Sequence, residues 1–335
     1  MRIAWIILLG MLGSCGYEKA NAPYAFPATP VGEVPQPPHN LATVQGVALG
    51  KKLFFDPKLS SSNTVSCATC HHTNKAFSDG VSLTRVGVSG EVLIRHSPAL
   101  FNLAWYDGFF WDGGSKNLEA QVFGPLTHPD EMGMDLFELV QKLQEDAVYP
   151  SLFKEVWGSD TITTQRIARA LAQYERTLLS FNSPYDQYKA RGKALEGETL
   201  AGEKVYQQYC ASCHTAGLFT DVSYHANGID SLMDDRSHEL THFGRYRITN
   251  DSVDIGKFKT VSLRNLVFTG PYMHDGRFER LEEVFSHYFR DHRTNPLADP
   301  ILKSQDYSLV DEKQKKALKA FLISLSDSTF IQKTP

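Results

Sequence analysis

The sequence contains two copies of a pentapeptide that commits a chain to one kind of cofactor, Cys67-Ala68-Thr69-Cys70-His71 and Cys210-Ala211-Ser212-Cys213-His214. Each copy reads C-x-x-C-H, the attachment signal for a c-type haem. The two thiols add across the haem vinyl groups, and the following histidine is the proximal ligand of the iron. A thioredoxin-type cysteine pair needs no histidine directly after it, and the two cysteine pairs of a zinc ribbon lie closer together in the sequence. The sequence therefore predicts two covalent haems, attached through Cys67, Cys70, Cys210 and Cys213, with His71 and His214 on the irons.

The length and the net charge of the chain limit the number of domains and the kinds of partner to be expected. A chain of 335 residues is long enough for two domains of ordinary size. The formal net charge of −4 shows no polycation, so nucleic acid is not an expected partner. Only one of the five cysteines lies outside the haem motifs, which leaves no disulfide framework.

The N-terminus has the features of an export signal, as expected of a protein that carries c-type haem. Met1-Arg2 is followed by an apolar run from Ile3 to Leu12, which is too short to span a bilayer. The run ends in Leu12-Gly13-Ser14-Cys15, which resembles a bacterial lipobox. We expect residues 1–15 to be a lipoprotein-type signal peptide and Cys15 to carry a lipid that anchors a periplasmic protein to a membrane. The alternative is an ordinary signal peptide cut near Ser14.

The rest of the chain reads as mainly α. Residues 16–40 are rich in proline and are interpreted as a tether. Apolar residues at helical spacing then predict helices, and no segment alternates over the length of a strand. We expect an N-terminal haem domain at 41–195 and a C-terminal one at 196–335. The predicted helices are Leu41–Phe55, Asp135–Gln144, Thr163–Leu179, Thr199–Tyr209, Leu281–Arg290 and Asp311–Leu325.

An internal repeat supports two related halves. Shifting the chain by 163 positions places Leu100-Phe101-Asn102-Leu103 over Leu263-Arg264-Asn265-Leu266 and Asp112-Gly113 over Asp275-Gly276. In this register Trp111 matches His274. Each haem motif is thus followed by a related downstream element, as in a duplicated haem domain.

With both motifs and the repeat, the chain resembles the bacterial di-haem cytochrome c peroxidases, and within them the MauG-like branch. The stretches that carry the resemblance are Leu49-Gly50-Lys51-Lys52-Leu53-Phe54-Phe55-Asp56, Phe110-Trp111-Asp112-Gly113, Asn182-Ser183-Pro184-Tyr185-Asp186 and Gly270-Pro271-Tyr272-Met273-His274-Asp275-Gly276. The resemblance implies two cytochrome c-like domains with the haems near their interface. It also implies that the N-terminal haem reacts with hydrogen peroxide and that the C-terminal haem passes electrons to it.

The resemblance assigns three residues to the reaction. Trp111 falls between the two haems, where an indole can relay an electron, although it also suits a core position at the interface. Gln121 and Glu131 fall in the pocket of the peroxidatic haem. One glutamate can take a proton from the near oxygen of peroxide and return it to the far oxygen. The sequence alone does not choose among His128, Asp130 and Glu131; the resemblance selects Glu131.

The first departure from the family concerns the peroxidatic haem. Many members place a displaceable second histidine on this iron and need reduction to release it. Counted without a gap from Asp79-Gly80, that position is Gly87 here, and His72 and His96 do not fit it. We therefore expect an open first haem that needs no reductive activation.

The second departure concerns the other haem. Many members supply a methionine at a fixed distance after H-D-G, and that position is Tyr288 here, as in the MauG-like branch. Phenolate favours oxidised iron, whereas a thioether raises the potential. Tyr288 is the expected second ligand, with Met273, His274 and His287 as alternatives. A Tyr288 ligand leaves open a MauG-like oxidase that acts on a protein or organic substrate.

Further partners follow from the resemblance. The electron donor would be a small c-type cytochrome or cupredoxin, and a homodimer remains open. Family members bind calcium between the domains; Thr269 and Pro271 match the carbonyl ligands, but His96 replaces the asparagine and imidazole is a poor calcium ligand. An electron-transfer cytochrome with both irons capped is the competing non-enzyme hypothesis. We expect His225, His238 and His242 to be solvated loop histidines.

Overall fold

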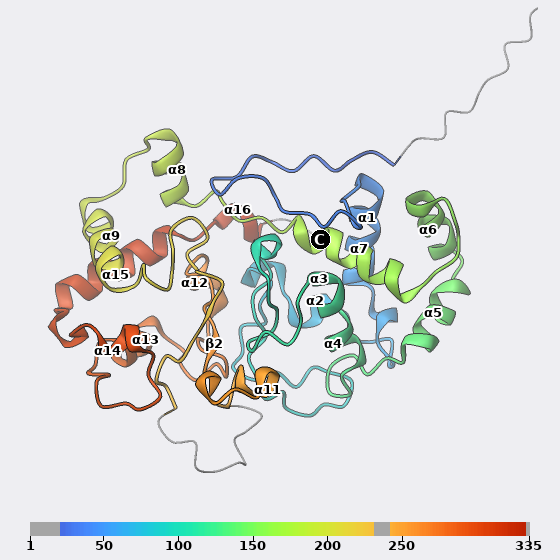
Figure 1. Ribbon diagram of the computed structural model, residues 1–335. Coiled ribbons are helices and arrows are strands. Elements are labelled where there is room, and N and C mark those ends of the chain that lie inside the picture. Colours follow the sequence, from blue (N-terminus) through green and yellow to red (C-terminus); the bar gives the residue numbers. More distant parts are fainter. Residues whose placement is uncertain (1–20, 231–241, 333–335) are drawn as a thin grey trace, which may run out of the picture.

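The computed structural model describes residues 21–230 and 242–332, which form two helical lobes side by side (Figure 1). The N-terminal lobe holds the first haem motif and the C-terminal lobe the second. The described strands are only two residues long: β1 (Tyr224–His225) pairs antiparallel with β2 (Phe258–Lys259). The mainly α prediction is therefore confirmed.

The helices of the first lobe are α1 (Val44–Phe55), α2 (Cys67–Cys70), α3 (Leu118–Gln121), α4 (Phe123–Thr127), α5 (Leu136–Gln144), α6 (Tyr149–Trp157) and α7 (Thr164–Arg176). Those that follow are α8 (Pro184–Arg191), α9 (Gly197–Tyr209), α11 (Tyr246–Thr249), α12 (Leu266–Thr269), α13 (Leu281–Tyr288), α14 (Pro300–Lys303), α15 (Glu312–Ser324) and α16 (Ser328–Ile331). All six predicted helices are present, with ends shifted by a few residues.

Helix α8 is a helix that the sequence did not predict. Ser183-Pro184 follows the predicted helix Thr163–Leu179 and agrees with its end. In the structure it also starts α8, because Ser183 Oγ accepts from the Asp186 N–H while the Asp186 carboxylate accepts from the Ser183 N–H. Proline at the first helical position needs no hydrogen-bond partner for its nitrogen.

The two lobes are built on equivalent pairs of crossing helices, α1 with α7 and α9 with α15. A Cβ added at Gly50 of α1 would lie 1.9 Å from the carbonyl oxygen of Ala170. A Cβ added at Gly202 of α9 would lie 1.9 Å from the carbonyl oxygen of Ala317. Both pairs therefore depend on one glycine that lets the helix backbones approach closely.

The repeat found in the sequence has a counterpart in the backbone. An isolated bridge joins Phe109 to Ser115 in the first lobe, and another joins Tyr272 to Phe278, displaced by the same 163 positions. Asn102 and Asn265, also a matched pair, have left-handed φ angles of 55° and 62°. The repeat is therefore structural as well as sequential.

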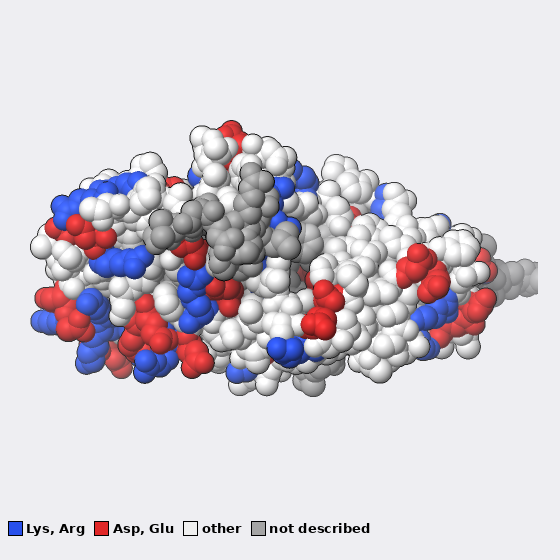
Figure 2. Space-filling view, turned by 90° about the horizontal axis from the view of Figure 1, so that it is seen from below, with Lys and Arg blue, Asp and Glu red and all other residues white. Residues whose placement is uncertain are grey.

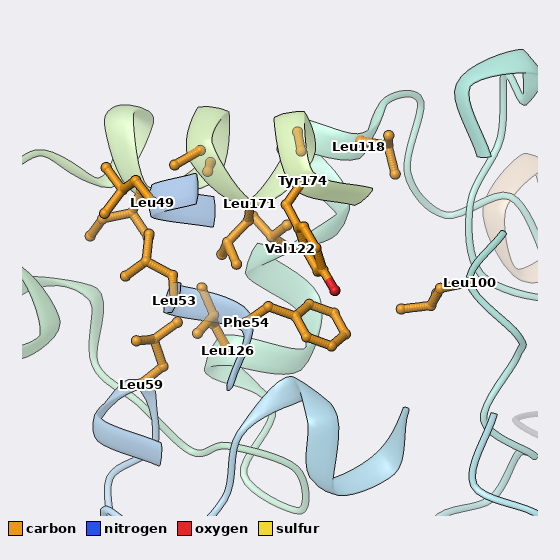
Figure 3. Close-up of a cluster of buried hydrophobic side chains, with 14 of the residues drawn as sticks. Leu49, Leu53, Phe54, Leu59, Leu100, Leu118, Val122, Leu126, Leu171 and Tyr174 are labelled. Carbon is orange, nitrogen blue, oxygen red and sulfur yellow. The ribbon is translucent and has the colours of Figure 1, made fainter. Parts of the chain in front are cut away.

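Each lobe has its own hydrophobic core. Figure 3 shows part of the first core, in which leucines of α1 meet Leu171 and Tyr174 of α7. The second core includes Tyr185, Tyr206 and Phe321. Because Leu178 belongs to the first core and Tyr185 to the second, α8 packs with the second lobe, although the predicted boundary lies after residue 195. Near the C-terminus the chain returns to the first core through Phe330.

The described part of the predicted proline-rich tether, residues 21–40, is in contact with the folded lobes. They form no helix, but they run along both lobes before α1 (Figure 1). The Asn21 side chain donates to the Val156 carbonyl at 2.8 Å, and the buried Asn40 side chain donates to Glu119 at 2.6 Å. These amides fix an extended segment that prolines keep out of helical geometry. The predicted signal peptide, with Cys15, lies outside the described residues.

The charged side chains on the surface are of both signs, in agreement with the low net charge. Figure 2 shows acidic and basic side chains interspersed on the face seen from below, most densely over the second lobe, at the left of the view. No helix in the described parts of the chain has both the length and the apolar composition to cross a membrane.

Candidate active site and haem cavities

The first haem motif lines a cavity in the N-terminal lobe. Ser66 caps α2, and its backbone N–H donates to Thr69 Oγ1 at 3.0 Å, which holds the short turn that carries the motif. The His71 Nδ1 lies 2.8 Å from the Phe77 carbonyl oxygen. A carbonyl can only accept, so Nδ1 carries the proton and Nε2 keeps the lone pair that a metal needs. The cavity is lined by Phe54, Val65, Ser66, Cys67, Cys70, His71, Leu100, Gln121, Val122, Pro125, Leu126, Glu131, Met132, Leu171 and Glu175.

The second motif repeats this arrangement beside a larger cavity. The His214 Nδ1 lies 3.2 Å from the Phe219 carbonyl oxygen, and Tyr206 donates its hydroxyl to the His214 carbonyl. Phe77 and Phe219 both have a positive φ, 60° and 57°, at the point where the chain turns back to the histidine. Cys210, Cys213 and His214 line the cavity together with His96, Phe101 and Trp111 of the first lobe. The second cavity thus lies at the interface of the lobes.

The residues present fit two c-type haems. Each cavity has two thiols and an imidazole whose second nitrogen is already oriented by a carbonyl. Burial lowers the pKa of both His71 and His214, so both rings are neutral and able to coordinate. Lys259 is buried and lines the second cavity, with its Nζ 3.3 Å from the Gly108 carbonyl oxygen. Its ammonium group is a suitable partner for a haem carboxylate.

The structure brings Gln121 and Glu131 into the first cavity with Cys67, Cys70 and His71. Of the three side chains that the sequence could not separate, only Glu131 lines it; His128 is exposed and its Nδ1 accepts from the Asp130 N–H at 3.2 Å. Burial is the main cause that raises the pKa of Glu131. A carboxyl so placed can hold a proton and release it within the cavity.

Gly87 lies against the backbone of this glutamate. The Val88 N–H donates to the Glu131 carbonyl at 2.8 Å, and a Cβ at Gly87 would lie 1.8 Å from the Asp130 carbonyl oxygen. A side chain of any kind is therefore excluded at this position unless the backbone moves. The loop packs against the backbone of Asp130 and Glu131 but sends no side chain into the cavity from residue 87.

Trp111 lies at the interface of the lobes and lines the second cavity but not the first. Its indole N–H donates to the His96 carbonyl at 2.7 Å, and its ring is T-shaped to the His274 ring. The position suits both interpretations made from the sequence, a relay and a buried interface residue.

Two of the alternative ligands for the second haem lie beside Tyr288. Tyr288, Met273 and His274 all line the second cavity, whereas His287 does not and its Nε2 lies 2.9 Å from the Asn227 carbonyl oxygen. The Asn227 side chain is within hydrogen-bond distance of Met273 Sδ, at 3.5 Å, and also interacts with the Tyr288 hydroxyl. Burial raises the pKa of Tyr288 to about 12, so the phenol stays protonated unless a metal ion displaces its proton.

His96, at the position of the family's calcium-binding asparagine, offers little to a cation. The His96 Nδ1 lies 2.7 Å from the Val81 carbonyl oxygen, and its Nε2 lies 3.3 Å from Ser78 Oγ. Both ring nitrogens therefore have protein partners, and the His96 carbonyl accepts a hydrogen bond from the Trp111 indole N–H. The side chain that replaces the family's asparagine is thus not available as a ligand.

The prediction of solvated loop histidines is wrong for two of the three. His225 is held between Asp221 and Asp299, each 2.8 Å from one ring nitrogen. The His242 Nδ1 lies 3.0 Å from Asp230 Oδ2. Loop position suggested exposure, but the loop folds back against the second lobe and supplies carboxylates. His238 lies outside the described residues.

Sequence reasoning missed Glu175 in the first cavity. Its side chain is buried, its Oε2 has no hydrogen-bond partner, and burial raises its pKa to about 8. The available signal was its spacing: Glu175 follows Leu171 by four positions and so shares the buried face of α7.

Comparisons with known proteins agree with this geometry. A family model described as di-haem cytochrome c peroxidase matches residues 44–194. The methylamine utilization protein MauG of Methylorubrum extorquens is 39% identical over 304 residues, 87% of this chain and 81% of that protein. The cytochrome c551 peroxidase of Nitrosomonas europaea is 33% identical over 277 residues, 82% of this chain and 79% of that protein. The solved structure of a MauG-like protein associated with microbial copper homeostasis matches with a TM-score of 0.82 and 28% identity, over 93% of this chain and 96% of that one.

Proposed function

Because the chain belongs to the di-haem cytochrome c peroxidase and MauG family, we propose that it reduces hydrogen peroxide to water with electrons from a small redox protein. The observation that carries this proposal is the meeting of Glu131 and Gln121 with the haem-binding thiols and His71 in one cavity. A pure electron carrier would have no need of a carboxylate there.

Glu131 is the proton carrier in this proposal. When bound, the first haem supplies the iron at which peroxide is reduced. Glu131 accepts the proton that peroxide must lose and returns it to the oxygen that leaves as water. The Gln121 amide can donate a hydrogen bond that orients the peroxide. Because position 87 is a glycine, no second histidine enters this cavity from that position, so we infer that peroxide needs no prior reduction of the protein to enter.

Cys210, Cys213 and His214 would hold the second haem, with Tyr288 as a further ligand of its iron, and this haem would take up the electrons of the donor. A small c-type cytochrome or cupredoxin is the donor class that fits a periplasmic chain of this family. Trp111 lies between the lobes, where its indole would relay the electrons to the first haem. The hydrogen bond from the Trp111 indole N–H to the His96 carbonyl keeps the ring in one position for that transfer.

A MauG-like oxidase is the second candidate function. Two features favour it: Tyr288 at the second cavity, since phenolate favours oxidised iron, and the absence of a side chain at Gly87. Such an enzyme would use the same two haems to oxidise a protein or an organic molecule. Turnover assays with a reduced cytochrome distinguish the two, because only a peroxidase sustains multiple turnovers with that donor.

We infer in addition that the mature protein is exported and lipid-anchored through Cys15. The lipobox-like Leu12-Gly13-Ser14-Cys15 is the support. Mass spectrometry of the mature N-terminus tests this: a diacylated Cys15 is the expected result, and cleavage elsewhere or an unmodified thiol contradicts it.

Electron paramagnetic resonance of the as-isolated ferric protein, before and after one equivalent of hydrogen peroxide, tests the proposed function. A high-spin and a low-spin signal that both collapse without prior reduction are expected. Two low-spin signals that do not change on addition of peroxide would mean that each iron already has two protein ligands. The proposal of an open first haem would then fail.

A further inference from the structure

We propose that Asp230, His242 and His274 form a binding site for a divalent first-row transition-metal ion, separate from both haems. Each of the three residues can present one ligand atom so that all three atoms lie within 4.8 Å of one another. His242 and Asp230 come from the loop region of the second lobe, and His274 from the H-D-G turn. Small side-chain adjustments bring three atoms at this separation to a common ion.

His274 supplies the observation that points to a ligand. Its side chain is only 2% exposed, and its Nε2 has no hydrogen-bond partner. The ring is stacked on Phe258, with centroids 3.8 Å apart and planes 9° apart, so it cannot easily turn to find another partner. A buried, unpaired polar nitrogen is costly, and coordination of a metal removes that cost.

Asp230 and His242 are in direct contact at the proposed site. The His242 Nδ1 lies 3.0 Å from Asp230 Oδ2, while Arg277 donates to Asp230 Oδ1 at 2.8 Å. Arg277 thus fixes the carboxylate through one oxygen and leaves the other facing the histidine. Outer partners of this kind orient metal-ligating side chains.

The donor set selects the class of metal. Two imidazoles and one carboxylate suit zinc, copper, nickel or iron, and three protein ligands leave one position for water. Calcium and magnesium prefer sites made wholly of oxygen atoms. The carboxylate of Asp230 also makes the site a poor place for a second anion, such as a haem carboxylate.

The location gives the metal a function that rests on the peroxidase proposal. His274 lines the second cavity, and its ring lies 6.5 Å from the ring of Trp111, the proposed relay. A fixed cation here disfavours positive charge on the neighbouring indole. We therefore expect the metal to slow electron transfer between the haems, as an inhibitor of turnover.

Titration calorimetry of the untagged, haem-loaded ferric protein, stripped with a chelator, tests the site with Zn²⁺. One Zn²⁺ per chain is expected, and no heat with Ca²⁺. His242→Gln and Asp230→Asn should each weaken zinc binding at least about tenfold. His39→Gln, at an exposed histidine in the segment before α1, is the matched control and should bind as the wild type does. Absence of zinc binding, or binding that neither variant weakens, overturns the proposal.

Peroxide turnover provides the second readout. One equivalent of Zn²⁺ should lower turnover of the wild type several-fold and leave His242→Gln unaffected. Equal inhibition of both proteins would show that zinc acts elsewhere and would contradict the regulatory part. If the protein binds zinc as expected but has no peroxidase activity, the proposed function fails while the metal site stands.

Discussion

The rings of Trp111 and His274 meet edge to face, with centroids 6.5 Å apart and planes at 71°, although the two residues occupy equivalent positions of the internal repeat. The duplicated halves therefore face each other through the same repeat position. What differs is the side chain: one half supplies an indole and the other an imidazole. A duplicated fold has thus acquired an asymmetric contact at its interface, where the two haems would communicate.

Replacing Trp111 tests this contact. Trp111→Phe removes the N–H that donates to the His96 carbonyl and leaves a ring that is harder to oxidise. We expect peroxide to react with the first haem at nearly the wild-type rate, while electron transfer from the second haem slows at least about tenfold. Stopped-flow absorption of the two haems measures both steps. The control is Trp105→Phe, at a half-buried tryptophan that does not line the second cavity; equal slowing in both variants would contradict a relay at Trp111.

Glu131→Gln keeps the size of the side chain but cannot carry the proton. We expect kcat/KM for peroxide to fall by about 10²–10⁴, the usual contribution of general acid–base catalysis. Burial raises the pKa of Glu131 above its ordinary value of 4.5. The wild-type kcat/KM should therefore fall as the pH is lowered through a value above 4.5, because Glu131 becomes protonated there and can no longer accept a proton. Asp130→Asn, one residue away and outside the cavity, should change the rate less than threefold, an estimate for a peripheral charge. A similar loss in both variants would argue against Glu131 as the specific carrier.

The identity of the second ligand at the second haem is settled by two conservative changes. If Tyr288 is the ligand, Tyr288→Phe removes the phenolate and changes the low-spin resonance signal and the reduction potential of that haem. Met273→Leu, in the same cavity, should leave both unchanged. The reverse pattern would show that the methionine is the ligand and that the second haem is a high-potential electron store.

Glu175 should make stability depend on pH. Its folded pKa of about 8 exceeds the ordinary value of 4.5, so the folded state holds a proton that the unfolded state releases. Its contribution to stability is therefore full below pH 4.5 and is lost as pH rises toward 8. Glu175→Gln mimics the protonated form and should unfold like the wild type at pH 4.5 but be more stable at pH 8.5, on the order of 2–4 kcal/mol.

Guanidinium unfolding of the haem-loaded protein at the two pH values measures this difference. Glu155→Gln, at an exposed position of α6, should show no such pH-dependent gain. A Glu175→Gln variant that is less stable than the wild type at both pH values would mean that the carboxylate is ionised and paired in the folded protein.

Gly202 tests the close helix crossing of the second lobe. Gly202→Ala places a methyl group 1.9 Å from the Ala317 carbonyl oxygen, which forces α9 and α15 apart. We expect a loss of about 1–3 kcal/mol or more in the free energy of unfolding, as for other overpacked sites. Gly197→Ala, at the start of the same helix with nothing within 4 Å of the added Cβ, should stay within about 0.5 kcal/mol of the wild type. Equal stability of both variants would show that the crossing tolerates a wider separation.

Local patterns in the sequence were enough to predict six of the longer helices and the type of cofactor. The apolar periodicity of residues 44–55 and 164–176 produced α1 and α7, and the missed α6 and α8 are short helices whose first turns contain proline. The contacts of the segment before α1 could not be predicted, because proline content indicates only which structures a chain cannot form. It does not report the distant partners, such as Val156 for Asn21, that hold an extended segment in place.

The sequence by itself was enough to predict covalent attachment of two haems, because each attachment motif consists of only five adjacent residues. It also determined the mainly helical, duplicated organisation, because helix period and repeat are local properties of the chain. Only the tertiary structure decided that Glu131 rather than His128 or Asp130 lines the first cavity, that Glu175 joins it, and that His274 lies buried beside Asp230 and His242. Those relations join residues from separate elements, and burial and distance between such residues arise only when the lobes pack together.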